Sequence, residues 1–284
     1  MNKIFLIITT FLLMSCNSTE PKVPNPEIPI PDGSVMVLNE DQNSGGSGTV
    51  IHSGAFVSVI LTNKHVCRVI EPGGFIAKGN SLYPIDAYKK YPKHDLCLVR
   101  VLDYIPGEVE IASRQVDIND MSRAIGHPLL SPTIISDGFF STKRFVKLIV
   151  GYKPCDAKTD PKYWVYCFRF GMVPVVETFV ARITSSTVRP GSSGSGVFND
   201  NGELSAVVFA GSGSFSYGAL VPLSYVKNFL NTHRRYSWRE PDGTEEKSKL
   251  YRRIFSVQNE CLNPKTKFKS MCSMISNNLL YWGK

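Results

Sequence analysis

The chain has 284 residues, of which 43% are hydrophobic and 20% are charged, and its formal net charge is +8. This length suits one large domain or two small ones, and the composition excludes an intrinsically disordered chain. The 22 glycines and 18 prolines follow no repeat. This excludes a collagen-like or low-complexity protein and indicates a fold with many turns.

The first 16 residues are organised as an export signal. Lys3 precedes an apolar run of 11 residues over positions 4–14, and Cys16 follows shortly after. Such a run is too short for a stable membrane span but suits a secretory signal. Residues 13–16, Leu-Met-Ser-Cys, resemble the bacterial lipobox, in which the cysteine is lipidated. We therefore expect a lipoprotein-type signal peptide over 1–16 with lipidation at Cys16. The alternative is an ordinary secretory signal, and both interpretations predict export.

Residues 17–33 are predicted to form a linker. The five prolines between positions 21 and 31 favour an extended polyproline geometry of about 3.1 Å per residue, which cannot pack a core. With a lipid at Cys16, this linker would hold a folded domain away from a membrane in the bacterial cell envelope. With an ordinary signal, the protein would be periplasmic or secreted. No other apolar stretch approaches the length of a transmembrane helix.

From residue 34 to about residue 232, short apolar runs alternate with turn residues. Runs of this length and spacing predict an all-β domain, either a sandwich or a barrel. Residues 222–230 predict a short helix, because Pro222 stands at its start and its apolar residues share one face. Examples of these runs are Gly48 to Ile51, Ala55 to Leu61, Leu96 to Leu102, Thr133 to Ile135, Lys147 to Tyr152, Trp164 to Phe170, Phe179 to Ile183 and Leu204 to Phe209.

Residues 233–284 are predicted to form a basic C-terminal extension. Positions 231–284 hold 11 Lys and Arg residues against 5 Asp and Glu residues. A helix over about 244–255 is expected, with Thr244 as its N-cap. A basic segment can bind nucleic acid or an anionic membrane. The chain has no motif that reads nucleic acid, so we expect a solvated basic surface and no nucleic-acid partner.

Six cysteines remain when Cys16 is assigned to the signal. An even number in an exported chain predicts disulfides, and the absence of any CxxC pair argues against a structural zinc site. Two pairs lie close enough in sequence to close local loops, which leaves a third pair. The three predicted pairs are Cys155 with Cys167, Cys261 with Cys272, and Cys67 with Cys97. The alternative for the last pair is two buried free thiols.

Three segments carry the residue types needed for nucleophilic catalysis, and in chain order they hold His65, Asp95 and Ser193. Serine is a weak nucleophile that needs a base within hydrogen-bonding reach. An imidazole can take its proton and return it to a leaving amine, and a buried carboxylate fixes the imidazole tautomer. Taken singly, the segments also suit a structural histidine, a strand-capping aspartate and a flexible Gly/Ser loop.

Short motifs then follow one another in the order of a known family. They are GSG at 46–48, LTNKHV at 61–66, HDL at 94–96, AIGHP at 124–128, GFFS at 138–141, GSSGS at 191–195 and YGALVP at 217–222. Together they resemble the trypsin-like serine peptidases of the chymotrypsin fold, and most closely the bacterial HtrA-like and glutamyl endopeptidase branches. The resemblance covers residues 34–232. It implies two six-stranded antiparallel β-barrels with a short C-terminal helix.

The resemblance also implies the roles of individual residues. His65 would be the general base, Asp95 its orienting carboxylate and Ser193 the nucleophile that forms an acyl-enzyme with a protein or peptide substrate. The N–H groups of Gly191 and Ser193 would form the oxyanion hole. No metal or organic cofactor is implied. The alternative function is an inactive protease-like module that binds peptides or a partner protein, and the presence of all four residues argues against it.

The residues expected to set the cleavage preference are Thr187, six positions before the nucleophile, and Phe209, Ala210 and Gly211 on the following strand. A preference for Lys or Arg needs an acid at the base of the pocket, and Thr187 carries no charge. We therefore expect cleavage after small or medium apolar residues. Cleavage after Glu or Asp, with Arg189 as the cation, is the second expectation.

Overall fold

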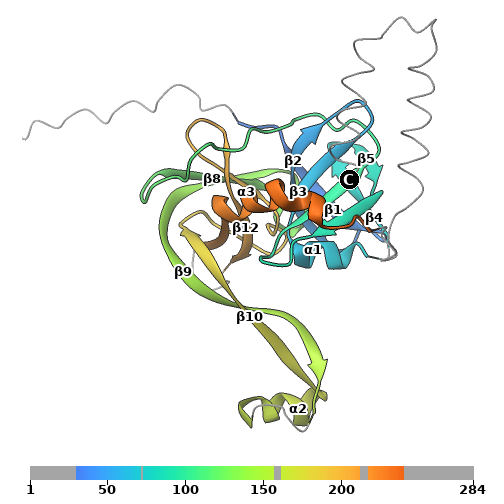
Figure 1. Cartoon of the computed structure of the whole chain (residues 1–284), viewed down its shortest axis with the longest axis vertical. Coiled ribbons are helices and arrows are strands. Elements are labelled where there is room, and N and C mark those ends of the chain that lie inside the picture. Colours follow the sequence, from blue (N-terminus) through green and yellow to red (C-terminus); the bar gives the residue numbers. More distant parts are fainter. Residues whose placement is uncertain (1–29, 72, 157–160, 212–216, 240–284) are drawn as a thin grey trace, which may run out of the picture.

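The computed structural model of the chain describes residues 30–71, 73–156, 161–211 and 217–239 (Figure 1). Several sequence predictions lie outside these residues. They are the signal peptide with Cys16, residues 17–29 of the linker, the pair Cys261 and Cys272, and the helix over 244–255. Within the described part of the chain, no helix is long and apolar enough to cross a membrane.

The N-terminal half forms one antiparallel sheet of seven strands in the order β5-β4-β1-β2-β3-β7-β6. Its strands are β1 (Ser34–Asn39), β2 (Gly45–Ser53), β3 (Ser58–Thr62), β4 (Gly74–Lys78), β5 (Ser81–Pro84), β6 (Ala87–Lys90) and β7 (Cys97–Val101). The seventh strand arises because β4 turns back at once into β5 through Gly79, whose φ is +57°. A short helix, α1 (Lys64–Val69), follows β3 directly.

The second half forms a closed antiparallel barrel in the order β10-β13-β12-β11-β8-β9. Its strands are β8 (Met121–Gly126), β9 (Ile134–Pro154), β10 (Met172–Thr184), β11 (Gly196–Phe198), β12 (Leu204–Gly211) and β13 (Gly218–Pro222). Helix α3 (Leu223–Thr232) begins directly after Pro222, as the sequence predicts. The all-β double-barrel prediction is confirmed, with one closed barrel of six strands and one open sheet of seven.

A shared hydrophobic core joins the two sheets. Leu61 and Leu98 from the first sheet, Phe179 and Phe209 from the second, and Phe229 from α3 all belong to one buried cluster. Each such side chain stabilises the fold by about 1.5–3 kcal/mol when it is fully buried. Two smaller clusters fill the separate sheet interiors. The halves therefore hold a fixed relation to each other, which a site built from both of them requires.

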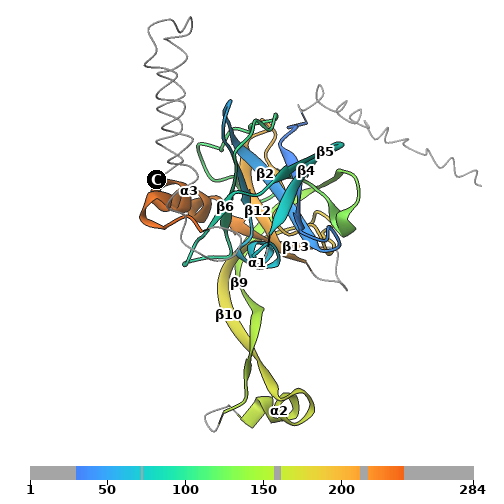
Figure 2. The same cartoon turned by 90° about the vertical axis from the view of Figure 1, so that its right-hand side faces the viewer.

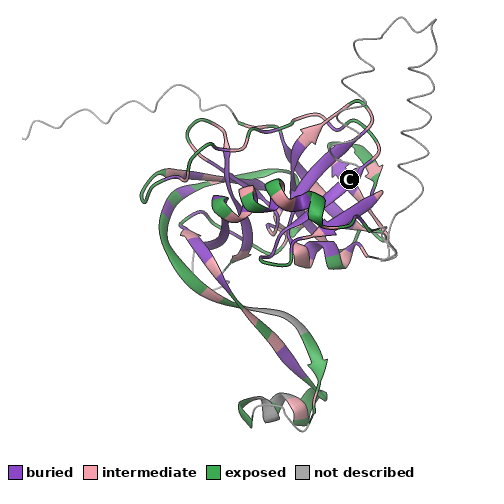
Figure 3. Ribbon diagram, viewed as in Figure 1, coloured by how far each residue is buried: buried purple, intermediate pink, exposed green. Residues whose placement is uncertain are grey.

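Strands β9 and β10 continue beyond the barrel as a two-stranded arm (Figures 1 and 2). Their pairing runs from Thr184 opposite Phe140 to Met172 opposite Pro154. Helix α2 (Trp164–Phe170) lies at the far end, so the prediction of a strand over these residues is wrong. The period of a short apolar run does not distinguish a strand from a helix. Much of the surface of the arm is exposed (Figure 3).

The chain continues to pack against the first sheet after α3. Trp238 is 5% exposed and belongs to the shared core. The backbone of Arg239 exchanges two hydrogen bonds with Tyr88 of β6, at 2.9 and 3.0 Å. The first residues of the predicted C-terminal extension, up to 239, are thus part of the packed domain.

Candidate active site

The pairing of β3 with β7 places two of the predicted catalytic residues at the same end of these two neighbouring strands. Thr62, the last residue of β3, lies opposite Cys97, the first residue of β7. Residues that follow β3 and residues that precede β7 must therefore lie close together. His65 is in the first turn of α1, just after β3, and Asp95 stands two residues before β7.

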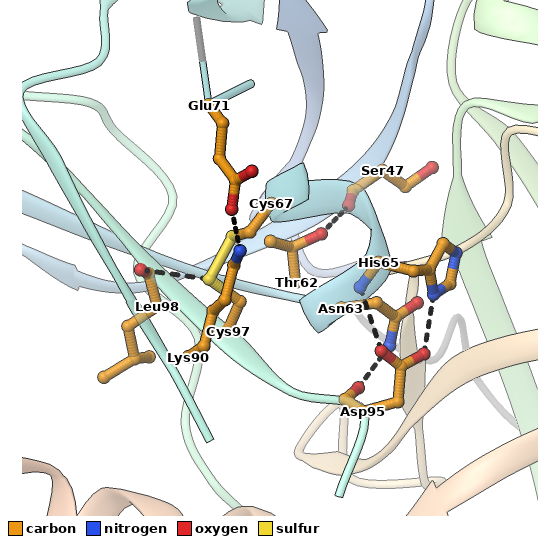
Figure 4. Close-up of a disulfide and its surroundings, with 10 residues drawn as sticks. All are labelled: Ser47, Thr62, Asn63, His65, Cys67, Glu71, Lys90, Asp95, Cys97 and Leu98. Carbon is orange, nitrogen blue, oxygen red and sulfur yellow. Dashed lines mark hydrogen bonds and ion pairs between the residues drawn. A yellow bond between two sulfur atoms is a disulfide. The ribbon is translucent and has the colours of Figure 1, made fainter. Parts of the chain in front are cut away.

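The imidazole of His65 is held by Asp95 (Figure 4). Its Nδ1 lies 2.6 Å from Oδ2 of Asp95, and the backbone N–H of His65 donates to Oδ1 at 3.0 Å. Asn63 donates its side-chain amide to the Asp95 carbonyl at 2.9 Å. The side chain of Asp95 is 2% exposed and that of His65 is 35% exposed. This arrangement keeps a proton on Nδ1 and leaves Nε2 as the basic nitrogen of a neutral ring.

His94 supports the backbone of Asp95. The backbone N–H of Asp95 donates to Nδ1 of His94 at 2.8 Å, and Nε2 of His94 lies 3.0 Å from the carbonyl of Val180 in β10. A neutral imidazole with its proton on Nε2 satisfies both contacts. Burial against the rings of Phe179 and Phe209 lowers the pKa of His94 and favours this neutral form.

Two glycines with left-handed backbone conformations shape the loop that carries Ser193. Gly191 has a φ of +89° and Gly194 has a φ of +90°. A Cβ at Gly194 would stand 1.9 Å from the carbonyl oxygen of Ser47. The N–H of Gly194 donates to Val208 of β12 at 2.8 Å, while the carbonyl of Ser193 accepts from Ser47 of β2 at 2.7 Å. The loop is therefore anchored to both sheets.

Gly46 permits the close approach of Ser193 to the helix that carries His65. A Cβ at Gly46 would lie 2.7 Å from Val66 and 2.8 Å from the carbonyl oxygen of Ser193. Val66 is the next residue after His65 in α1. The glycine thus lies between the Ser193 backbone and the start of α1, and any larger residue would push them apart. The sequence motif GSG at 46–48 has this physical basis.

The two N–H groups expected to form an oxyanion hole are free to bind a ligand. The carbonyl of Pro190 accepts a hydrogen bond from the N–H of Leu129 at 2.7 Å, and the carbonyl of Gly191 accepts one from Ser47 Oγ at 2.8 Å. Both carbonyls are engaged by groups outside the 191–195 loop. Among the described residues, the N–H groups of Gly191 and Ser193 have no acceptor, so both can donate to an oxygen that develops negative charge.

The residues predicted to bind substrate lie in different environments in the structure. Ala210 and Gly211 lie at the end of β12, where the described residues pair with that strand only through β13. The opposite edge of β12 is open from Phe209 onward, because its pairing with β11 ends at Val207. The Phe209 side chain is 1% exposed and packs in the shared core. Thr187 is exposed, and its N–H donates to Ser136 Oγ at 2.8 Å.

Val188, which the sequence analysis did not single out, packs against the paired strands β12 and β13 at Gly211 and Gly218. A Cβ at Gly211 would lie 2.9 Å from Val188 Cγ1, and one at Gly218 would lie 2.5 Å from Val188 Cγ2. The two glycines are directly paired across the strands. The glycines at 211 and 218 were the available sequence signal, because paired glycines indicate that another group approaches the backbone closely.

Two of the predicted disulfides are present. Cys67 is bonded to Cys97 and Cys155 to Cys167. The first bond joins α1 to β7, two residues beyond His65 and two beyond Asp95 (Figure 4). The second closes the end of the arm. The described residues contain no cluster of three or more His, Cys, Asp or Glu side chains placed to hold a metal ion.

Comparison with known proteins agrees with the fold. The sequence model of the trypsin-like peptidase domain matches residues 46–207. The active form of the Rv3671c protease from M. tuberculosis is 17% identical, with a TM-score of 0.52 over 75% of this chain and 92% of that one. The serine endoprotease from Yersinia pestis is 19% identical, with a TM-score of 0.52 over 72% of this chain and 64% of that one. A search of curated protein sequences found no significant match.

Proposed function

Because this chain belongs to the trypsin-like peptidase family, it is a serine endopeptidase, and we propose that it hydrolyses peptide bonds through an acyl-enzyme on Ser193. The observation that carries this mechanism is the short contact between His65 Nδ1 and Asp95 Oδ2, at 2.6 Å. It orients the other ring nitrogen of His65 as a base.

The proposed reaction proceeds in two halves. His65 takes the proton of Ser193 Oγ as this oxygen attacks the substrate carbonyl, and the N–H groups of Gly191 and Ser193 stabilise the resulting oxyanion. His65 then returns the proton to the leaving amine, which leaves an ester between the substrate acyl group and Ser193. Water, activated by the same imidazole, hydrolyses that ester. Asp95 stabilises the imidazolium in both halves.

The open edge of β12 supports substrate binding by strand addition. A peptide that pairs with Ala210 and Gly211 gains backbone hydrogen bonds, which are independent of its sequence. Next to this edge, Val188 packs against Gly211 and Gly218, and we expect its side chain to limit the size of the residue accepted at the cleaved bond. We therefore propose cleavage after small or medium apolar residues. Arg189 is exposed and does not favour the alternative of cleavage after Glu or Asp.

The cellular location is the remaining part of the proposal. The two disulfides are consistent with an extracytoplasmic protein. The export signal and the cysteine at position 16 support attachment to the bacterial cell envelope by a lipid anchor. Under this proposal the membrane is a partner through the anchor alone, and the catalytic domain acts on protein or peptide substrates.

Labelling with a fluorophosphonate probe tests the nucleophile directly, since this probe reacts with serines that an adjacent base activates. The wild-type protein should be labelled, and Ser193→Ala should abolish both the labelling and the hydrolysis of peptides. Ser195→Ala is a matched control, because Ser195 lies two positions beyond the nucleophile and is 2% exposed. Labelling that persists in the Ser193→Ala protein would refute the assignment.

A further inference from the structure

A cavity of about 640 Å³ lies where the base of the arm meets the end of β12. Phe145 of β9, Ile183 of β10 and Tyr217 contribute apolar surface to it, and Ala210 and Gly211 border it along β12. The cavity therefore adjoins the strand edge that is open to substrate. Val188, which packs against Gly211 and Gly218, is not among the residues that line it.

The charged side chains described along this cavity are all positive. Arg144 and Lys147 of β9 line it, and the described residues of its lining include no aspartate or glutamate. Both cations are exposed, and neither forms a salt bridge with the residues that the structure describes. Glu177, which stands on β10 opposite β9, lies 3.7 Å from Lys64 instead. In the part of the chain that the structure describes, the two cations thus lack a local counter-ion, so a carboxylate on a ligand would be attracted to them.

The direction of an added strand determines which part of a substrate reaches the cavity. Strand β11 pairs antiparallel with β12 along this edge as far as Val207. A peptide that continues the same antiparallel pairing runs from Gly211 towards Phe209, and so towards the Ser193 loop. The residues that precede the scissile bond therefore lie beside the cavity. The residue at the cleaved bond lies nearer to Ser193.

We propose that this cavity recognises a carboxylate side chain on the substrate, a few residues before the scissile bond. Arg144 binds the carboxylate, and Ile183 contacts the methylene groups that carry it. Lys147, which stands three residues further along β9 and so on its other face, adds to the positive potential of the cavity. The proposal rests on the peptidase function above and deepens it. The enzyme selects substrates that combine a small apolar residue at the cleaved bond with an acidic residue upstream.

The test uses the full-length protein and internally quenched peptides that differ only in having Glu or Gln at the third, fourth or fifth position before the cleaved bond. At one of these positions the Glu peptide should have a kcat/KM about tenfold higher, as a partly exposed charge-assisted hydrogen bond would produce. The ratio should fall as NaCl is raised, because salt screens exposed charges. A Glu/Gln ratio within twofold of one at all three positions would overturn the proposal.

Variants identify the cations responsible. Arg144→Gln should bring the Glu/Gln ratio to about one, and Lys147→Gln should lower it less. Lys143→Gln is the matched control, because Lys143 is an exposed cation of the same strand that does not line the cavity. An equal loss of the ratio in Lys143→Gln would show general attraction by the basic arm and would overturn the assigned site.

A binding measurement separates this proposal from the proposed function. A fluorescent Glu peptide should bind the Ser193→Ala protein more tightly than its Gln counterpart, as measured by fluorescence anisotropy, and Arg144→Gln should remove that difference. If the wild-type protein cleaves no peptide, the peptidase mechanism fails, while the binding difference still decides whether the carboxylate site exists. Equal binding of the two peptides would refute the carboxylate site.

Discussion

His94 illustrates how a side chain outside the predicted triad can support it. Its two ring nitrogens join the backbone of Asp95 to the carbonyl of Val180 in the other half of the molecule. Its burial lowers its pKa, so the ring stays neutral and keeps Nδ1 as an acceptor for Asp95. The carboxylate that orients His65 is therefore fixed through a contact that spans both sheets.

Replacing Asp95 with asparagine tests the contribution of Asp95 to orienting the His65 imidazole separately from its contribution to the fold. The amide would retain the shape of the carboxylate but would favour the wrong tautomer of His65. We expect turnover to fall by roughly 10⁴-fold while the fold is retained, as for the equivalent change in trypsin. Peptide hydrolysis and the circular dichroism spectrum would be measured on the same preparation. A turnover within tenfold of wild type would contradict the role of Asp95.

Val188 is expected to limit the size of the residue accepted at the cleaved bond. Val188→Ala removes the two methyl groups that approach Gly211 and Gly218, so peptides with Leu or Phe at that position should gain relative to Ala and Val. The buried truncation should also destabilise the protein by about 2 kcal/mol. Profiling of a peptide library before and after the substitution measures the change.

Val35→Ala controls for loss of stability alone. Val35 is fully buried in the first sheet, so its truncation should give a similar loss of stability and leave the cleavage preference unchanged. The same shift in preference for both variants would indicate that general loosening, and not the pocket, sets the specificity.

Helix α1 carries His65, and Asp95 stands two residues before the start of β7. A cysteine follows each of these residues two positions later. The Cys67–Cys97 bond therefore joins the two elements that hold His65 and Asp95 together. The second bond, Cys155–Cys167, lies at the end of the arm, far along the chain from these elements. The two disulfides thus restrain different parts of the molecule.

Removing both cysteines of the first bond should weaken the fold and the site together. The double variant Cys67→Ser/Cys97→Ser should lose roughly 3–4 kcal/mol, because a loop of this length is no longer constrained in the unfolded chain. Its kcat should fall as well, since α1 and β7 are no longer joined. Urea unfolding and peptide hydrolysis measure the two effects.

The double variant Cys155→Ser/Cys167→Ser provides the comparison. Its bond restrains only the arm, so we expect kcat on a peptide without an acidic residue to stay within about twofold of wild type. If kcat fell equally in both double variants, the first disulfide would have no particular connection with the site.

The buried histidines make the stability of the protein depend on pH. Burial lowers the pKa of His52, His94 and His127, and it lowers the pKa of His233 to about 4. In the unfolded chain these histidines are protonated as the pH falls through about 6.5, whereas in the folded protein they are protonated only at lower pH. The stabilisation that they give is complete above pH 6.5 and is lost as the pH falls towards about 4.

We therefore expect the midpoint of urea unfolding to fall steadily between pH 7 and pH 5. The measurement is a series of equilibrium unfolding curves at constant ionic strength. His94→Phe, which removes one of the buried titrating groups, should have a shallower dependence over this range. A midpoint that stays constant from pH 7 to pH 5 would contradict the prediction.

The information carried by short stretches of sequence explains why some structural predictions were confirmed and one was wrong. The prediction of a helix after Pro222 rests on a local pattern and is confirmed. The pairing of Cys67 with Cys97, predicted because these cysteines remain once the two short loops are assigned, is confirmed as well. The apolar run at 164–170 carries no local feature that separates helix from strand, and it forms α2 at the end of the arm.

The amino-acid sequence alone determined the all-β class, the order of the predicted catalytic residues and the glycine motifs GSG at 46–48 and GSSGS at 191–195, because each depends on residue types at short spacing. Their relation in space depends on contacts between distant segments. Pairing of β3 with β7 brings His65 to Asp95, and Gly46 admits Ser193 beside α1. The packing of Val188 against Gly211 and Gly218 and the cavity beside Arg144 arise in the same way, since packing of distant segments leaves no periodic trace along the chain.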